Sequence, residues 1–126
     1  MLVVDASVVV VALGDDGEDG ERFRERLRGE ALAAPELIDV EVLSAWRRFI
    51  SDEARATAAI EDLKNLWIQR LSVRNLLARC WELRDNVTTY DAAYVALAEV
   101  LGVTLLTADS RLSRASGIRC PVELIS

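Results

Sequence analysis

The sequence contains no histidine and only one lysine, Lys64. Without histidine, the chain cannot use an imidazole as general acid or base, which excludes the metal-free hydrolytic mechanisms that depend on one. Arginine therefore supplies nearly all of the positive charge, as planar groups that match phosphate and carboxylate. The net charge of -6 argues against a protein that coats nucleic acid generally, because such binding comes from neutralised phosphates.

Cysteine is scarce as well. Cys80 and Cys120 lie far apart and form no CxxC or Cys/His pattern, so a zinc site and a disulfide framework are both disfavoured. We expect two reduced residues in a cytoplasmic protein. The apolar opening segment, LVVDASVVVVAL, has no basic region before it, contains Asp5 and is too short to span a bilayer, so we expect no membrane association.

The length and composition are those of a globular domain. The chain has 126 residues, of which 52% are hydrophobic and 29% charged. A domain of this size buries well over half of its unfolded surface, so no linker or second unit is needed. We expect one domain over residues 1–126.

Hydrophobic patterning predicts alternating strands and helices. The expected strands are 2–5, 31–34 (stopped by Pro35), 103–107 and 122–125, with a short buried strand at 67–68. The expected helices are 7–13, 21–28, 36–50, 53–66, 72–84 and 91–101, the last ended by Gly102, with a short helix starting at Asp109. In helix 72–84, the residues expected to face the core are Leu76, Leu77, Cys80, Trp81 and Leu83. This alternation predicts an α/β fold, a three-layer α/β/α sandwich around a mostly parallel sheet.

Four acidic residues stand at the junctions of these elements: Asp5, Glu41, Asp91 and Asp109. Asp5 and Asp109 directly follow predicted strands, which places both at the carboxyl edge of a parallel sheet, where ligands bind. Taken singly, Asp5, Asp91 and Asp109 are each explained by a helix N-cap, and Glu41 by a surface position at the edge of an apolar stripe. Taken together, they match a site for Mg²⁺ or Mn²⁺, which prefer oxygen ligands.

Three hydroxyl residues lie close to these acids in the sequence: Ser7, Thr89 and Thr107. They could hydrogen-bond the carboxylates, although local turn and cap bonding is the simpler role. Asp39 lies only two residues from Glu41 but faces another side of the predicted helix, so it is the less suitable ligand.

Four segments containing the acids occur in a fixed order: VVDAS, LIDVEVLSAW, TTYDAAYVALAE and LLTADSRL. In order and separation they resemble the PIN-domain family, and within it the VapC-type toxin ribonucleases, over essentially the whole chain. The resemblance implies an α/β/α sandwich and RNA cleavage dependent on Mg²⁺ or Mn²⁺, leaving a 5′-phosphate and a 3′-hydroxyl. It also implies a small antitoxin partner, with a segment lying in an apolar groove, and a homodimer within larger assemblies.

The same resemblance assigns the acidic positions of the family to Asp5, Glu41, Asp91 and Asp109, as catalytic residues and metal ligands. It assigns the frequent hydroxyl positions beside the cofactor to Ser7 and Thr107. The alternative from another functional class is a catalytically silent PIN-like module that binds protein or RNA.

Two other acid-rich α/β families do not fit the residues. A phosphoacceptor receiver domain needs a lysine after a late strand, whereas Lys64 lies within a predicted helix. A phosphatase of the haloacid-dehalogenase type needs an aspartate two residues after its nucleophile, and Ser7 occupies that position relative to Asp5.

Overall fold

The computed structural model describes residues 1–126 and is built around a five-stranded sheet. The strands are β1 (Leu2–Val4), β2 (Leu32–Pro35), β3 (Gln69–Leu71), β4 (Thr104–Thr107) and β5 (Val122–Leu124). Their order is β3-β2-β1-β4-β5, and every neighbouring pair is parallel. β1 is central because its Leu-Val-Val sequence is apolar on both faces, as a strand covered on both sides requires.

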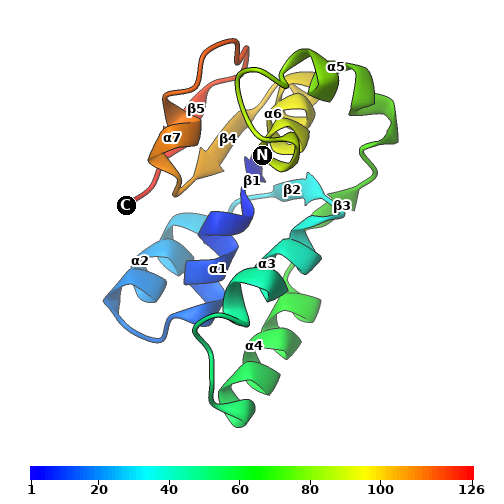
Figure 1. Cartoon of the computed structure of the whole chain (residues 1–126). Coiled ribbons are helices and arrows are strands. Elements are labelled where there is room, and N and C mark those ends of the chain that lie inside the picture. The colour runs from blue at the N-terminus through cyan, green and yellow to red at the C-terminus, as the bar shows by residue number, and fades with distance from the viewer.

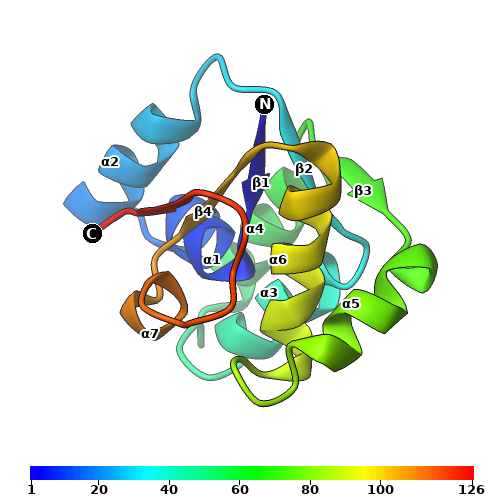
Figure 2. The same cartoon turned by 90° about the horizontal axis from the view of Figure 1, so that it is seen from above.

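Helices cover both faces of the sheet, which confirms the three-layer α/β/α architecture. They are α1 (Ala6–Gly14), α2 (Glu18–Leu27), α3 (Ile38–Trp46), α4 (Glu53–Asn65), α5 (Leu77–Glu82), α6 (Thr89–Leu101) and α7 (Ser110–Ser113), with a 3₁₀ turn η1 (Arg74–Leu76) before α5. Helices α5 and α6 lie on one side of the strands and α1 to α4 on the other (Figure 1). Seen from above, α6 lies across the central strands, and α2 and α5 lie at opposite ends (Figure 2).

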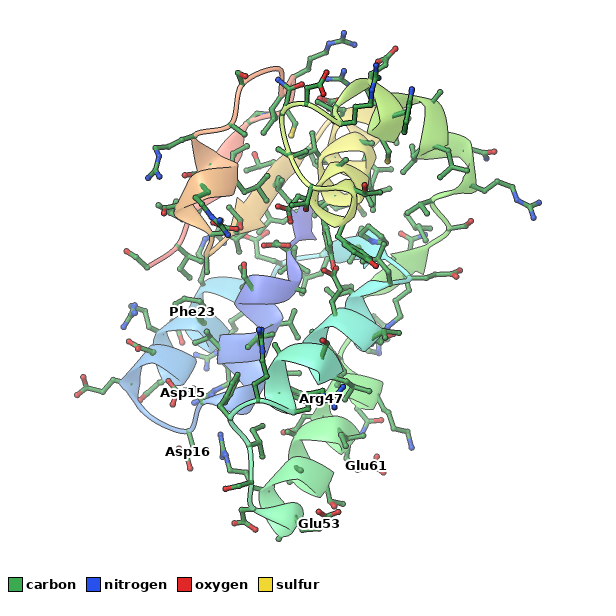
Figure 3. All side chains as sticks on the ribbon, in the orientation of Figure 1. Asp15, Asp16, Phe23, Arg47, Glu53 and Glu61 are labelled. Carbon is green, nitrogen blue, oxygen red and sulfur yellow. The ribbon has the colours of Figure 1, made fainter.

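The core consists of 28 buried apolar residues drawn from both faces of the sheet. In α1, Val8 and Val9 are fully buried although β-branched residues are mediocre helix formers. Burial of each such side chain contributes about 1.5–3 kcal/mol, which outweighs the small propensity cost. Charged residues other than Asp5 lie outside the buried interior, as Figure 3 shows for Glu53 and Glu61 on the outer side of α4.

Helix α6 is held by defined signals at both ends. The Thr88 hydroxyl accepts a hydrogen bond from the backbone N–H of Asp91 at 3.2 Å, which makes Thr88 the N-cap. The helix therefore starts at Thr89, two residues earlier than predicted. Gly102 ends it in the left-handed conformation with φ of 68°, as the sequence predicted.

The predicted buried strand at 67–68 is wrong. The strand is β3, at Gln69–Leu71, and Trp67 is 95% exposed. β3 is an edge strand, so the backbone hydrogen bonds to β2 define it better than apolar side chains do. Pro35 was predicted to stop the strand at residue 34, but it is itself the last residue of β2. A proline is tolerated there because β1 pairs with β2 only at Leu32 and Ala33 and requires no N–H from Pro35.

The expected helix 72–84 is also shorter than predicted and is divided into η1 and α5. Cys80 and Leu83 are buried as expected, but Leu77 and Trp81 are 59% and 68% exposed. A six-residue helix lying on α6 buries one narrow stripe, so its outward apolar residues stay in solvent. Similarly, α3 starts at Ile38 and ends at Trp46, within the predicted 36–50, and leaves Val40 69% exposed.

Both cysteines are free, and no helix is long and apolar enough to cross a membrane. Lys64 lies in α4 and pairs with Glu61 on the surface, so it does not follow a strand as the lysine of a receiver domain does.

We expect Glu99→Gln to lower the free energy of unfolding at neutral pH by about 1–3 kcal/mol. Glu99 accepts hydrogen bonds from Arg79 Nε at 2.7 Å, from Arg79 Nη2 at 3.0 Å and from the Arg119 backbone at 2.8 Å. The Arg79 guanidinium is the main reason why the pKa of Glu99 is lowered. A lowered acid pKa contributes stability above the ordinary glutamate pKa, and this contribution is lost as pH falls through the folded value.

Urea unfolding at neutral and at strongly acidic pH measures the effect. Glu61→Gln is the control, since Glu61 is exposed and its pair with Lys64 is worth little. An equal cost of Glu99→Gln at both pH values would contradict the role of the ionised carboxylate.

Candidate active site

The four acidic residues predicted from the sequence gather where the central strands end. Asp5 follows β1 and its backbone N–H donates to Leu106 of β4 at 2.9 Å, which fixes the two strand ends side by side. Asp109 follows β4 and caps α7, whereas Glu41 and Asp91 come from the first turns of α3 and α6. Figure 1 shows α3 and α6 on opposite sides of the end of β1.

Asp5 is held by two hydroxyl groups. The Ser7 and Thr107 side chains both donate to Asp5 Oδ2, at 2.6 and 2.8 Å, and Asp5 is only 6% exposed. The Asp5 side chain makes no N-cap hydrogen bond, so the capping explanation does not apply to it. Because both hydroxyls bind Oδ2, Oδ1 has no side-chain donor and is the oxygen available to a ligand.

The same hydroxyls join the two strand ends. The backbone N–H groups of Ala108 and Asp109 donate to Ser7 Oγ at 2.9 Å and to Thr107 Oγ1 at 3.0 Å. Each hydroxyl therefore accepts from the β4–α7 turn while donating to Asp5, and successive bonds of this kind polarise one another. The orientation of Asp5 is thus coupled to the position of Asp109.

Glu41 is fixed by a residue to which the sequence analysis gave no role. The Tyr94 hydroxyl donates to Glu41 Oε1 at 2.7 Å, and Tyr94 is fully buried. Tyr94 lies three residues after Asp91 in α6, so both face the same side of the helix. That spacing is visible in TTYDAAYVALAE and is the signal that could have identified it.

The N-cap role that the sequence allowed is confirmed for Asp109 and is wrong for Asp91. Asp91 is the third residue of α6, three after the Thr88 cap. The Asp109 side chain caps α7 by accepting from the Arg111 backbone at 2.9 Å, and Arg111 Nε lies 3.8 Å from its Oδ1. Asp39 faces away, as predicted, and forms a bidentate pair with Arg70 of β3 at 2.7 and 3.0 Å.

Burial and mutual repulsion raise three of the acid pKa values. Burial is the main cause for Asp5, where the Ser7 and Thr107 bonds oppose the shift and the charge of Asp109 adds to it. Burial also raises the pKa of Glu41, against the Tyr94 bond and with the charges of Asp5 and Asp91. For Asp91, burial and then the charge of Asp5 raise the pKa. Asp5 is therefore the electrostatic centre of the group.

The donor chemistry fits a hard divalent cation. All four side chains offer carboxylate oxygens, and the one ion pair that any of them makes is the 3.8 Å approach of Arg111 to Asp109. As the side chains stand, no three of the chain's acids and cysteines lie close enough to form a complete metal cage. Mg²⁺ needs no such cage, since it retains several waters and uses one or two carboxylates.

Two surface hollows adjoin the acids. The Asp91–Asp109 hollow, of about 450 Å³, is lined by these acids, the segment 84–88 and Arg111. The Glu41 hollow, of about 580 Å³, is lined by Glu41, Arg48, Tyr90 and the outer face of α3. The acids therefore lie between two open spaces that a long substrate could enter.

An open parallel sheet between helical layers, with an acidic centre at its carboxyl edge, defines the class of this protein. The model of the PIN domain matches residues 2–118, and the chain belongs to the PIN-domain family. This confirms the resemblance seen in the four sequence segments.

Its relatives include VapC-type proteins of the same length. Ribonuclease VapC1 of Mycobacterium tuberculosis is 44% identical over 128 residues, covering 98% of this chain and 96% of that protein. Ribonuclease VapC9 of the same species is 39% identical over 129 residues, covering 99% of this chain and 98% of that protein.

Among solved structures, the sarcin–ricin loop-cleaving toxin VapC20 of M. tuberculosis superposes with a TM-score of 0.73 at 14% identity, covering 94% of this chain and 97% of that one. VapBC2 of Rickettsia felis, bound to a DNA fragment from their promoter, gives a TM-score of 0.70 at 16% identity, covering 99% and 98%.

We expect Asp91→Asn to raise the melting temperature of metal-free protein at neutral pH. The folded pKa of Asp91 is raised, so its contribution favours folding below the ordinary aspartate pKa and is lost as pH rises through the folded value. At neutral pH its charge penalises the folded state, and asparagine removes that charge. Differential scanning fluorimetry in EDTA measures the change.

Adding Mg²⁺ should stabilise the wild type by mass action and the Asp91→Asn protein by less. Asp62→Asn, at an exposed position of α4, should respond to Mg²⁺ as the wild type does. If Asp91→Asn is less stable in EDTA, or gains as much from Mg²⁺ as the wild type, Asp91 is a structural residue of α6.

Proposed function

We propose that this chain is a metal-dependent endoribonuclease of the VapC type, the toxin of a toxin–antitoxin pair acting in the cytoplasm. One observation carries the proposal: the carboxylates of Glu41, Asp91 and Asp109 gather around the buried carboxylate of Asp5 at the end of the central strands. Full-length relatives named VapC ribonucleases support it.

Asp5, Glu41, Asp91 and Asp109 would hold Mg²⁺ or Mn²⁺. Such an ion, when bound, lowers the pKa of water and offsets the charge that develops on a phosphodiester. Ser7 and Thr107 keep Asp5 Oδ1 free by binding Oδ2, and Tyr94 does the same for Glu41 Oε2 by binding Oε1. These three residues thus position the ligands.

Hydrolysis then needs no nucleophile from the protein. A water oxygen would form the new bond to phosphorus and lose its proton to a carboxylate, while the bond to the 3′-oxygen breaks and the leaving 3′-oxygen takes a proton from solvent water. The carboxylate of Glu41 suits this role because burial raises its pKa above the ordinary glutamate value, which makes it a stronger base. The products would carry a 5′-phosphate and a 3′-hydroxyl.

We expect Asp5→Asn, Glu41→Gln and Asp91→Asn each to reduce RNA cleavage by about a hundredfold or more, since each removes a charge from the reacting centre. Excess EDTA should abolish wild-type cleavage, and Mg²⁺ or Mn²⁺ should restore it. Gel-resolved cleavage of structured RNA measures both effects.

Asp39→Asn is the matched control, on the same helix as Glu41 but paired with Arg70. It should cleave at close to the wild-type rate. Cleavage that persists in EDTA would refute the metal mechanism, and wild type without any cleavage would favour the catalytically silent module.

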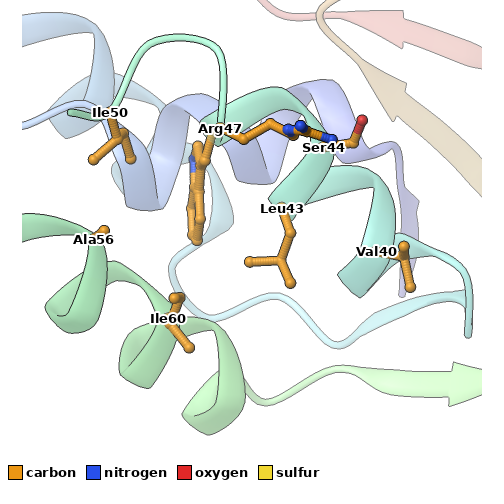
Figure 4. Close-up of a pocket in the computed structure, with 8 residues that line it drawn as sticks. Val40, Leu43, Ser44, Arg47, Ile50, Ala56 and Ile60 are labelled. Carbon is orange, nitrogen blue, oxygen red and sulfur yellow. The ribbon is translucent and has the colours of Figure 1, made fainter. Parts of the chain in front are cut away.

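The surface also offers a place for an antitoxin segment. An apolar groove of about 520 Å³ runs between α3 and α4, with Leu43 and Ile60 facing each other across it (Figure 4). Val40 and Ser44 line both this groove and the Glu41 hollow, so the two are continuous along α3. An apolar antitoxin segment in the groove would reach Glu41 at its end, where a basic side chain could neutralise the acids.

We expect Leu43→Asp to abolish neutralisation by the cognate antitoxin, because the substitution places a charge in the apolar groove. RNA cleavage by the isolated protein should remain, since Leu43 lines the groove and neither of the hollows beside the acids. Co-expression growth assays and calorimetric titration with the antitoxin measure this.

Leu101→Asp provides the control, at a helical leucine of similar exposure: 39% against 42% for Leu43. Unchanged antitoxin affinity in Leu43→Asp would exclude the α3–α4 groove as the antitoxin site.

A further inference from the structure

The Asp91–Asp109 hollow carries two guanidinium groups that the proposed mechanism does not use. Arg84 enters it from the turn after α5 and Arg111 from α7. Asp85, Asp91 and Asp109 line the same hollow, so a free anion would meet three carboxylates there. A phosphodiester chain fits better, because one phosphate can lie at the acids together with a cation while the next pairs with arginine.

Arg84 is held in place by Trp81 and forms no ion pair with a carboxylate. Its guanidinium carbon lies 4.6 Å from the centre of the Trp81 ring, and Nη1 donates to the Trp81 carbonyl at 2.9 Å. By contrast, Arg26 and Arg79 are each bound to glutamates through short ion pairs. The positive charge of Arg84 is thus both fixed and unneutralised, which favours phosphate binding with little ordering cost.

Arg111 is available in a different way. Its side chain is 88% exposed, and its one acidic contact is the 3.8 Å approach to Asp109 Oδ1. An exposed pair of this length is weak, so the guanidinium can turn toward a phosphate.

Trp81 adds an aromatic surface beside the hollow. It is 68% exposed and is not a core residue, and its ring lies against the Arg84 guanidinium. Nucleobases stack on exposed aromatic rings and on arginine planes when they are free of a duplex. Trp81 and Arg84 together present both kinds of planar group.

We infer that the Asp91–Asp109 hollow is a binding site for one unpaired ribonucleotide next to the scissile bond. Arg84 and Arg111 bind its phosphodiester, and its base stacks on the Trp81–Arg84 pair. The inference rests on the proposed function, since it takes RNA as the substrate, and it names single-stranded or looped RNA as the form bound. The site lies by α5 and α7, on the far side of the strands from the α3–α4 groove (Figure 1).

Fluorescence anisotropy with a short labelled single-stranded oligoribonucleotide in Mg²⁺ tests the inference. Binding is measured in the Glu41→Gln background, so that cleavage does not interfere. Arg84→Gln and Arg111→Gln should each weaken binding about fivefold or more and lower the slope of log affinity against log salt by about 0.7. Trp81→Ala should weaken binding about tenfold, and Trp81→Phe should retain most of it.

Two controls match these substitutions. Arg74→Gln removes an exposed arginine that has no carboxylate partner and does not line the hollow, and Trp67→Ala removes an exposed tryptophan on the other side of the protein. Both should bind RNA as the parent does. Melting temperatures of all variants verify folding, and antitoxin affinity should not change in any of them.

The inference is overturned if Arg84→Gln and Arg111→Gln bind RNA as the parent does, or if the controls lose as much affinity. It is also overturned if duplex RNA binds as tightly as the single strand and depends equally on Trp81. Because this assay requires no cleavage, it is independent of the proposed activity: wild type that binds through Arg84 but does not cleave would refute the catalytic proposal alone.

Discussion

The rest of the site depends on the burial of a single carboxylate, Asp5, at the end of the central strand. A carboxylate in this position is costly unless its oxygens are hydrogen-bonded, and Ser7 and Thr107 provide those bonds to one oxygen only. The same two hydroxyls accept N–H groups from the β4–α7 turn, so the bonds that make Asp5 tolerable also set the position of Asp109. Since Glu41 and Asp91 are coupled to Asp5 by charge, the whole acidic centre is organised around this residue.

Stability and function oppose one another at this centre. Burial raises the pKa values of Asp5, Glu41 and Asp91, which means that their ionised forms are disfavoured in the fold at neutral pH. Elsewhere the acids do the reverse: the arginine partners of Glu99 and Glu123 lower the pKa values of these residues, and the pairs hold α5 to α6 and α2 to β5. The chain thus separates acids that stabilise the fold from acids that are retained at a cost. The net charge of -6 conceals this division.

Helix α3 connects two features that the proposed function needs. Its first turn supplies Glu41 to the acidic centre, while Leu43 and Trp46 line the groove shared with α4. A segment bound in this groove is therefore directed toward the acids by the helix itself. On the other side of the sheet, α6 presents Asp91 to Asp5 and Asp109, and Tyr94 to Glu41. The two helical layers consequently meet at the acidic centre, and each contributes an acidic residue to it.

The sequence by itself determined the alternation of elements, the parallel sheet, the Gly102 helix end and the four acids. These follow from local causes: apolar runs, capping residues and the rule that parallel strands end at one edge. The tertiary structure alone decided the rest. Trp67 and Trp81 are as apolar as core residues, and only the packing of an edge strand and a short helix leaves them in solvent. Likewise, the Tyr94 hydroxyl donates a hydrogen bond to Glu41, 53 residues away in the sequence, and the Thr107 hydroxyl donates one to Asp5, 102 residues away. No local sequence pattern predicts these hydrogen bonds, because they form only when the helices and strands pack together.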